Sequence, residues 1–444
     1  MEWGIVPISF QLAGLKAALS GSETRGHYPI GNSWTEVALG EGLGPWALLH
    51  NRAFILFQAR GTANSVGYSV YVGTILWLSY RLTGGILWSG VVIGVQTIVF
   101  TLTFLISPPV DRLYDKRWVF VACYPMQAVL ALVLGLTYAI GALTIPLLLV
   151  IVVFLAVLYD FTEAADETTT RLLFGRDRLF IVSGIAGAIG GGVSITLYFT
   201  AGATLALFGA SGGAFLLAGL LAAGTGLAVP LSIPTPRTTS QTWWNGLREG
   251  WALFRGTEGR PLRQLAVQQF VVGFFLAGPT LLLTLYVGQF FQGSQATYAA
   301  FYVAYLIGGI VIGLLLGHTN PRGSIGAVTI GSMLVIGLAL LGAEIAVVSV
   351  SATTVVWFVV GAASTARNQS TWTYLQGRFE PQMLARVSMN IYLFTGVSSA
   401  IGAFAIGALS ATWSPQNITL LVGIGFIGSA GLGVLLRETR TLAF

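Results

Sequence analysis

Twelve apolar runs, each long enough to cross a membrane, limit what this chain can fold into. A helix needs about 20 apolar residues to span the hydrocarbon core of a bilayer. The runs lie near residues 54–79, 86–107, 118–140, 142–162, 180–203, 206–231, 265–290, 297–317, 325–347, 349–374, 387–409 and 417–436. Only 9% of the residues are charged, whereas a soluble domain carries about 25%, which argues against a large soluble enzyme. We predict an all-α membrane protein with twelve transmembrane helices.

A charged turn, Ser107–Arg117, follows the second run and orients the others. Polar turns with a net positive charge face the cytoplasm, where anionic lipids attract them. If this turn lies inside, Arg81 is the basic residue that falls outside, and the other basic residues of the turns fall inside. We therefore predict a multi-pass protein of the cell membrane, with both termini in the cytoplasm.

Residues 232–262 form the longest polar interruption, with six runs before them and six after. Within this segment Trp243, Leu247, Trp251 and Phe254 recur at intervals that place them on one face of a helix. Such a pattern predicts an amphipathic helix that rests on the inner membrane surface.

The chain is accordingly predicted to divide into four parts. These are an N-terminal extension (1–50), a six-helix bundle (51–231), a cytoplasmic linker (232–262) and a second six-helix bundle with a short tail (263–444). The extension is polar and glycine-rich over its second half. It is expected to lie in the membrane interface or to dock a protein partner.

Two six-helix halves, a cytoplasmic middle loop and a charged turn after the second span resemble the major facilitator superfamily of secondary transporters. The signature turn of that family runs roughly Gly-x-Leu-Ala-Asp-Arg-x-Gly-Arg-Arg. This sequence is similar to it through Asp111, Arg112, Lys116 and Arg117, but has Tyr114 at a usual glycine. The resemblance covers about residues 50–437 and implies a conformational-switch role for the four matching residues.

Three further stretches resemble the drug- and siderophore-exporter branch of that superfamily. Gln376–Pro381 is similar to the turn after the tenth span, and Gly278-Pro279 stands where Gly-Pro is often found in the seventh. Ser183, Gly187, Gly191 and Gly192 fit a glycine motif of the fifth span, although Ala188 replaces its proline.

Polar side chains interrupt the first apolar run. Arg60, Asn64, Tyr68 and Tyr71 share one helical face. In the resembled fold the first, fourth, seventh and tenth spans line the central cavity, which implies that these residues contact the solute. The alternative is that Arg60 reaches the inner headgroups or ties helices together.

The fourth span ends in acidic residues, and the tenth carries an arginine. Asp160 and Glu163 are candidates for carrying a proton, because a desolvated carboxylate has a raised pKa. Arg367 is expected to pair with Glu163 in an inner gate, and Asn368 and Thr371 to line the cavity beside it. The alternatives are that the acids are solvated at the inner surface, and that Arg367 bonds carbonyls at a helix end.

Other chemistry has no sequence support. Neither lysine follows a glycine, so there is no Walker A loop, and no His-Glu-x-x-His is present. The three histidines are far apart and there is one cysteine. We expect no enzyme activity, cofactor, metal or nucleic-acid partner. The leading prediction is an exporter of a small amphiphilic solute, working by alternating access in exchange for protons. An uptake symporter of the same fold, or a non-transporting subunit docked through residues 1–50, are the alternatives.

Overall fold

The computed structural model describes residues 52–102, 110, 115–231, 252, 254–255, 259–319, 325–378 and 381–440, with the backbone alone over 170–192. These residues are almost entirely helical, and no strand occurs among them. The helices of the first half are α3 (Arg52–Thr83), α4 (Leu87–Thr101), α6 (Arg117–Ala139) and α7 (Ile145–Ala228). Those of the second half are α9 (Arg260–Leu276), α10 (Gly278–Phe290), α11 (Gln295–Thr319), α12 (Ile325–Ala346), α13 (Val350–Arg378), α14 (Pro381–Leu409), α15 (Pro415–Leu435) and α16 (Arg437–Arg440). The predicted all-α membrane fold is confirmed.

Eight segments of the described chain are long and apolar enough to cross a membrane. They come from α6, both ends of α7, the α9–α10 pair, α11, α12, α14 and α15. Helix α4 is apolar but has only 15 residues in the described range. Helices α3 and α13 are long but less apolar, and they carry the polar residues singled out above. The count of twelve spans stays a prediction.

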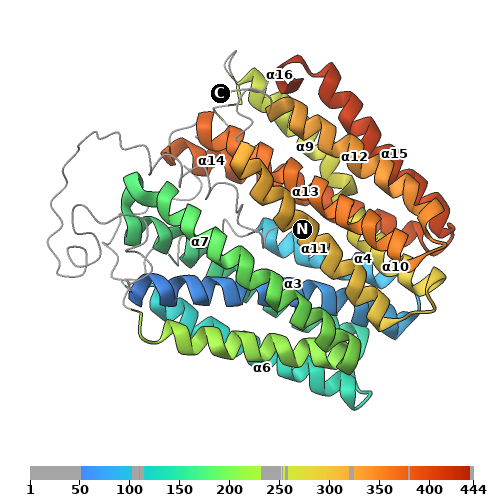
Figure 1. Ribbon diagram of the computed structural model, residues 1–444, viewed down its shortest axis with the longest axis horizontal. Coiled ribbons are helices and arrows are strands. Elements are labelled where there is room, and N and C mark those ends of the chain that lie inside the picture. The colour runs from blue at the N-terminus through green and yellow to red at the C-terminus, as the bar shows by residue number, and fades with distance from the viewer. Residues whose placement is uncertain are drawn as a thin grey trace, which may run out of the picture.

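Helix α7 does not run straight. Tyr159 and Leu217 both lie against Gly67 of α3. In a straight helix these two residues would be almost 90 Å apart at about 1.5 Å per residue. The segment must therefore turn back on itself, as Figure 1 shows for its green and yellow-green parts. This helical segment contains the predicted run 180–203 and nearly all of 142–162 and 206–231.

The helices form two groups (Figure 1). In the N-terminal group, α3 and α6 pack on α7; in the C-terminal group, α13 packs on α11 and on α12, and α12 packs on α15. The groups meet where α4 packs on α14 and where α7 packs on α11. One continuous hydrophobic core runs through both. The predicted domain boundaries fall partly outside the described residues and stay predictions.

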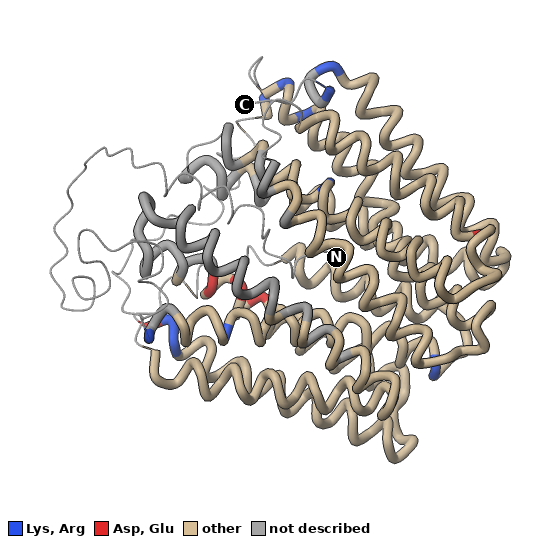
Figure 2. Tube along the Cα trace, in the orientation of Figure 1, with Lys and Arg blue, Asp and Glu red and all other residues tan. Residues whose placement is uncertain are grey.

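Charge is distributed unequally between the two ends of the bundle (Figure 2). Helix α6 begins at Arg117 and α9 begins at Arg260, while the short α16 packs on α9. We call the end of the bundle at which α6 and α9 begin the charged end. Helix α3 finishes near Arg81 at the opposite end, which we call the Arg81 end.

Two local features bear on the sequence predictions. The helical axis is interrupted at Ala277, between α9 and α10, directly before Gly278-Pro279. Proline lacks the N–H that would continue the ladder, which accounts for the interruption. Phe254, predicted on the lipid-facing side of an amphipathic helix, is buried in a small apolar cluster with Leu262 and Leu265. Its predicted companions Trp243, Leu247 and Trp251 lie outside the described residues.

Candidate functional site

Arg60 lies inside the N-terminal group, where it joins three helices. Its Nη1 donates to the Tyr124 hydroxyl at 2.6 Å and to Asp166 Oδ2 at 3.2 Å, and its Nη2 pairs with Asp166 Oδ1. The guanidinium carbon is 3.8 Å from the ring centroid of Phe120 and 4.7 Å from that of Phe57. The side chain is fully buried. A buried arginine needs such partners, because an unpaired charge in a low-dielectric interior is costly. In this conformation Arg60 ties helices together.

The two tyrosines of the predicted stripe belong to an aromatic cluster. Tyr71 stacks on Tyr159 of α7, with ring centroids 5.6 Å apart, and Tyr68 meets the edge of Tyr159 at 5.2 Å. Phe100 of α4 adds a ring 5.7 Å from Tyr68. Both tyrosines of α3 are buried. The stripe therefore faces the protein interior, as its spacing predicts, and contacts α4 and α7.

Two buried amides lie along this cluster. Gln96 Nε2 is 3.4 Å from the Tyr68 hydroxyl, and Asn64 is one helical turn before Tyr68. Asn64 Oδ1 and Gln96 Oε1 are buried and accept no hydrogen bond from any described residue. Buried polar atoms are nearly always satisfied, so these two acceptors call for a donor that is not part of the described chain. A hydroxyl or amine of a solute, or a water molecule, has the required chemistry.

The acids of the fourth span occupy different environments. Asp160 is buried, with 2% of its surface exposed, whereas Glu163 is exposed. Asp166 is bound by Arg60 as described. The side chain of Glu167 lies outside the described residues.

A second polar network lies in the C-terminal group and joins α9 to α13. Arg367 Nη1 donates to Gln269 Oε1 at 3.2 Å, and Gln269 Nε2 donates to Thr371 Oγ1 at 3.0 Å. Thr371 Oγ1 also donates to the Arg367 carbonyl at 3.1 Å. Arg367, Gln269 and Thr371 are buried, and Asn368 is half-buried. The predicted pairing of Glu163 with Arg367 stays a prediction.

The charged turn ties the start of α6 to its surroundings. Lys116 is buried and its Nζ donates to the Val110 carbonyl at 2.8 Å. Arg117 pairs with Asp115 at 3.2 Å, and its Nη1 donates to the Val229 carbonyl, just past the end of α7, at 3.4 Å. Asp111 and Arg112, the other two predicted switch residues, lie outside the described residues.

Sequence reasoning missed the partners of both arginines. Asp166 is one of the acidic residues that end the fourth span, and it does not share the helical face of Asp160, Glu163 and Glu167. Arg60 contacts the other face of that helix. The signal that could have found Tyr124 is its distance from the charged end. Arg60 lies eight residues into α3 and Tyr124 seven residues into α6, and both helices begin at that end. Gln269 was visible only as a polar residue within an apolar run.

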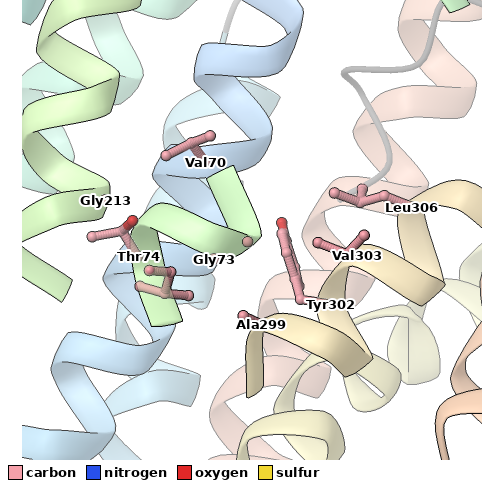
Figure 3. A pocket seen from close by; sticks show the side chains of 10 residues that line it. Val70, Gly73, Thr74, Gly213, Ala299, Tyr302, Val303 and Leu306 are labelled. Carbon is pink, nitrogen blue, oxygen red and sulfur yellow. The ribbon is translucent and has the colours of Figure 1, made fainter. Parts of the chain in front are cut away.

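A hollow lies between the two groups, toward the middle of α3 (Figure 3). Its walls are nearly all apolar, and they come from α3, α7 and α11. The lining residues are Val70, Gly73, Thr74, Gly202, Leu205, Gly213, Ala299, Tyr302, Val303 and Leu306. The ring of Tyr302 stands between the two helix groups in this view.

Comparison with known proteins identifies the fold. No protein-family model matches this sequence, and no curated protein matches it. Among solved structures, a mutant of the nucleoside transporter NupG superposes with a TM-score of 0.63 at 17% identity, covering 87% of this chain and 98% of that one. A bacterial homologue of the human lysosomal transporter Spinster, inward-facing and occupied, gives 0.64 at 12% identity, covering 90% and 98%. The human organic anion transporter MFSD10 gives 0.58 at 16% identity, covering 86% and 99%.

The chain is a multi-pass helical membrane protein with the fold of the major facilitator transporters. At these identities the likeness establishes the fold alone, since one fold hosts many functions. The solute and the direction of movement must be argued from the residues.

Proposed function

We propose that this protein is a secondary transporter that moves a small amphiphilic solute across the cell membrane by alternating access. The observation that carries the proposal is the pair of polar networks inside a membrane-spanning fold. Arg60 and Asn64 belong to the N-terminal group, and Arg367, Gln269 and Thr371 to the C-terminal group. Polar and charged side chains inside a membrane bundle are expensive to hold there, and they commonly mark a solute or ion pathway.

The proposed solute carries both apolar surface and hydrogen-bond donors. The rings of Tyr68, Tyr71 and Tyr159 would contact its apolar part, because large aromatic surfaces bury such groups well. The amide oxygens of Asn64 and Gln96 would accept its donors. Asn368 and Thr371 would line the cavity from the C-terminal group.

Export in exchange for protons is the finer proposal. The similarity of Gln376–Pro381 and of the fifth-span glycines to exporter motifs supports the direction. Asp160 supports the coupling, because a carboxylate desolvated between helices can take up a proton near neutral pH. We further propose that both termini are cytoplasmic and that the charged end faces the cytoplasm, as the basic residues there favour.

Counterflow of radiolabelled solutes in proteoliposomes tests the transport proposal. Vesicles loaded with one candidate solute should accumulate the labelled form, and Asn64→Leu should abolish this without loss of folded protein. A solute that acidifies or alkalises the lumen as it moves would establish proton coupling, and inverted vesicles would give the direction. Absence of counterflow across a broad panel, together with a stoichiometric protein partner bound through residues 1–50, would favour the non-transporting subunit.

Charge exchange tests the proposed inner gate. Glu163→Arg and Arg367→Glu should each reduce transport, and the double exchange should restore part of it if the two side chains pair when the charged end closes. Val355→Ala in the same assay, at an exposed position of α13 outside the polar network, is the control for a change in that helix that leaves the charge untouched. A double exchange no better than either single variant would remove the gate from the account.

A further inference from the structure

Two tyrosines of α11 bond across the boundary between the helix groups. The hydroxyl of Tyr298 donates to the Gly73 carbonyl of α3 at 2.9 Å, and that of Tyr302 donates to the Ser69 carbonyl at 2.9 Å. The donors are four residues apart on one helix and the acceptors four residues apart on the other. This matched spacing places one turn of α11 against one turn of α3.

The rings reinforce the same contact. Tyr298 and Tyr302 stack with their centroids 6.0 Å apart and their planes within 8° of parallel. Trp77, one turn beyond Gly73 on α3, stacks on Tyr298 at 4.6 Å. Trp77 and Tyr298 are fully buried. The contact therefore continues along α3 toward the Arg81 end.

Gly73 makes the close approach possible. A methyl group at this position would lie 2.9 Å from Cε1 of Tyr302. Figure 3 shows the ring of Tyr302 alongside Gly73, with Val70 and Thr74 on either side. Any larger residue at 73 would push the ring, and α11 with it, away from α3.

These contacts have a property suited to repeated opening. Each hydroxyl bonds a helical carbonyl that also serves its own helix, so separating α3 from α11 leaves the backbone of α3 intact. Water entering the gap can replace the carbonyl as acceptor, so the hydroxyls are not left unsatisfied. The hollow that Tyr302 lines together with Val70 and Leu306 leaves space beside the ring.

We propose that Tyr298 and Tyr302 form a latch that holds the two helix groups together toward the Arg81 end, and that this latch sets how often that end opens. Its role in a transport cycle rests on the proposed function above. The effect of the latch on the separation of the two helix groups can be measured with no solute present.

Distance measurement between two spin labels tests the latch. Ile140→Cys and Val348→Cys place labels on exposed residues of opposite groups at the Arg81 end. Cys123→Ala removes the native thiol. In proteoliposomes, Tyr298→Phe and Tyr302→Phe keep both rings and remove the hydroxyls. Each should raise the ratio of separated to closed molecules about fivefold, and the double variant more, given the usual net strength of one hydrogen bond.

A matched control separates the latch from a general loss of buried hydroxyls. Tyr286 is equally enclosed, but its hydroxyl bonds Glu344 at 2.7 Å and Thr419 at 3.1 Å within the C-terminal group. Tyr286→Phe should leave the label distances unchanged. An unchanged distance distribution in the Tyr298→Phe/Tyr302→Phe protein would overturn the latch, as would an equal shift in Tyr286→Phe.

A second pair of variants keeps both tyrosines. Gly73→Ala should shift the labels toward the separated distribution, whereas Gly61→Ala, on the same helix with no neighbour within 4 Å of the added carbon, should not. Separated labels without any solute movement would leave the latch standing and count against the transport proposal. Solute movement with unchanged label distances would support the transport proposal and count against the latch.

Discussion

The two ends of the bundle are held in different ways. Toward the Arg81 end the strongest contacts join one helix group to the other: Tyr298 and Tyr302 bond α3, and Gly90 of α4 packs directly on the Ala403 carbonyl of α14. Toward the charged end the polar contacts described lie inside a group, as with Arg60 and Asp166, or with Arg367 and Gln269.

Contacts inside a helix group keep that group rigid, whereas contacts between the two groups decide which end of the bundle is closed. Among the described residues, contacts join the two halves at the Arg81 end and lie within each half at the charged end, an arrangement that fits the proposed rocking of the halves about the middle of the bundle.

Asp166→Ala should have the largest effect on stability. It leaves the fully buried guanidinium of Arg60 without its carboxylate; breaking a pair with both partners buried costs about 3–5 kcal/mol, and less is expected here because Asp166 is 21% exposed. Thermal unfolding in detergent should show a large fall in midpoint. Asp166→Ala combined with Arg60→Met should recover much of it, because the uncompensated charge is gone. A stable single variant would show that Arg60 does not hold the N-terminal group together.

Gly90→Ala should act between the groups. The added carbon would clash with the Ala403 carbonyl and Gly407, and overpacking of this kind costs about 1–3 kcal/mol. In the proposed cycle this contact separates when the Arg81 end opens, so the open form should gain population at the expense of the closed one. Labels at Ile140 and Val348 report this, and Gly85→Ala, which meets no neighbour within 4 Å, is the control. A fall in the unfolding midpoint without any change in distance would place this contact among those that maintain the fold.

Gln269→Leu should weaken solute binding by breaking the C-terminal network. It removes the amide that bridges Arg367 and Thr371, each bond contributing about 1 kcal/mol or somewhat more for the charged one. We expect solute affinity to fall roughly tenfold while the protein remains folded. Val267→Ala, at an exposed neighbouring position, is the control for an altered α9. Unchanged affinity for the solute in Gln269→Leu would remove this network from the proposed cavity.

Asp115→Ala should have the smallest effect. Its pairing with Arg117 is partly exposed at the charged end, and such pairs contribute at most about 1 kcal/mol. The unfolding midpoint should shift by only a degree or two, and the difference from the parent protein should shrink at high salt, which screens the pair. A loss as large as that of Asp166→Ala would mean that the turn carries far more of the fold than its exposure indicates.

The sequence predicted the helices well because a membrane imposes a simple rule. A run of about 20 apolar residues must be helical, since no water is present to satisfy its backbone. The runs at 118–140, 325–347 and 417–436 agree with α6, α12 and α15 to within a few residues. Within α7 the predicted runs end near 162 and 203, and Gly209, with a φ of 68°, lies close to the second of these breaks.

The site was harder to predict because pairing is decided in three dimensions. The spacing of Arg60, Asn64, Tyr68 and Tyr71 gives one face, but it does not name Asp166, which is 106 residues away. Tyr298 and Tyr302 sit within an apolar run where aromatic residues are ordinary. Nothing in that run distinguishes hydroxyls that bond another helix group from hydroxyls that bond their own.

The most direct test of alternating access is to measure both ends of the same protein in the same membrane. Trp118→Cys with Arg440→Cys reports the charged end, and Ile140→Cys with Val348→Cys reports the Arg81 end. We predict opposite responses: when Tyr298→Phe/Tyr302→Phe lengthens the distance at the Arg81 end, the distance at the charged end shortens. Two distances that lengthen together, or a charged end that stays fixed, would contradict the account.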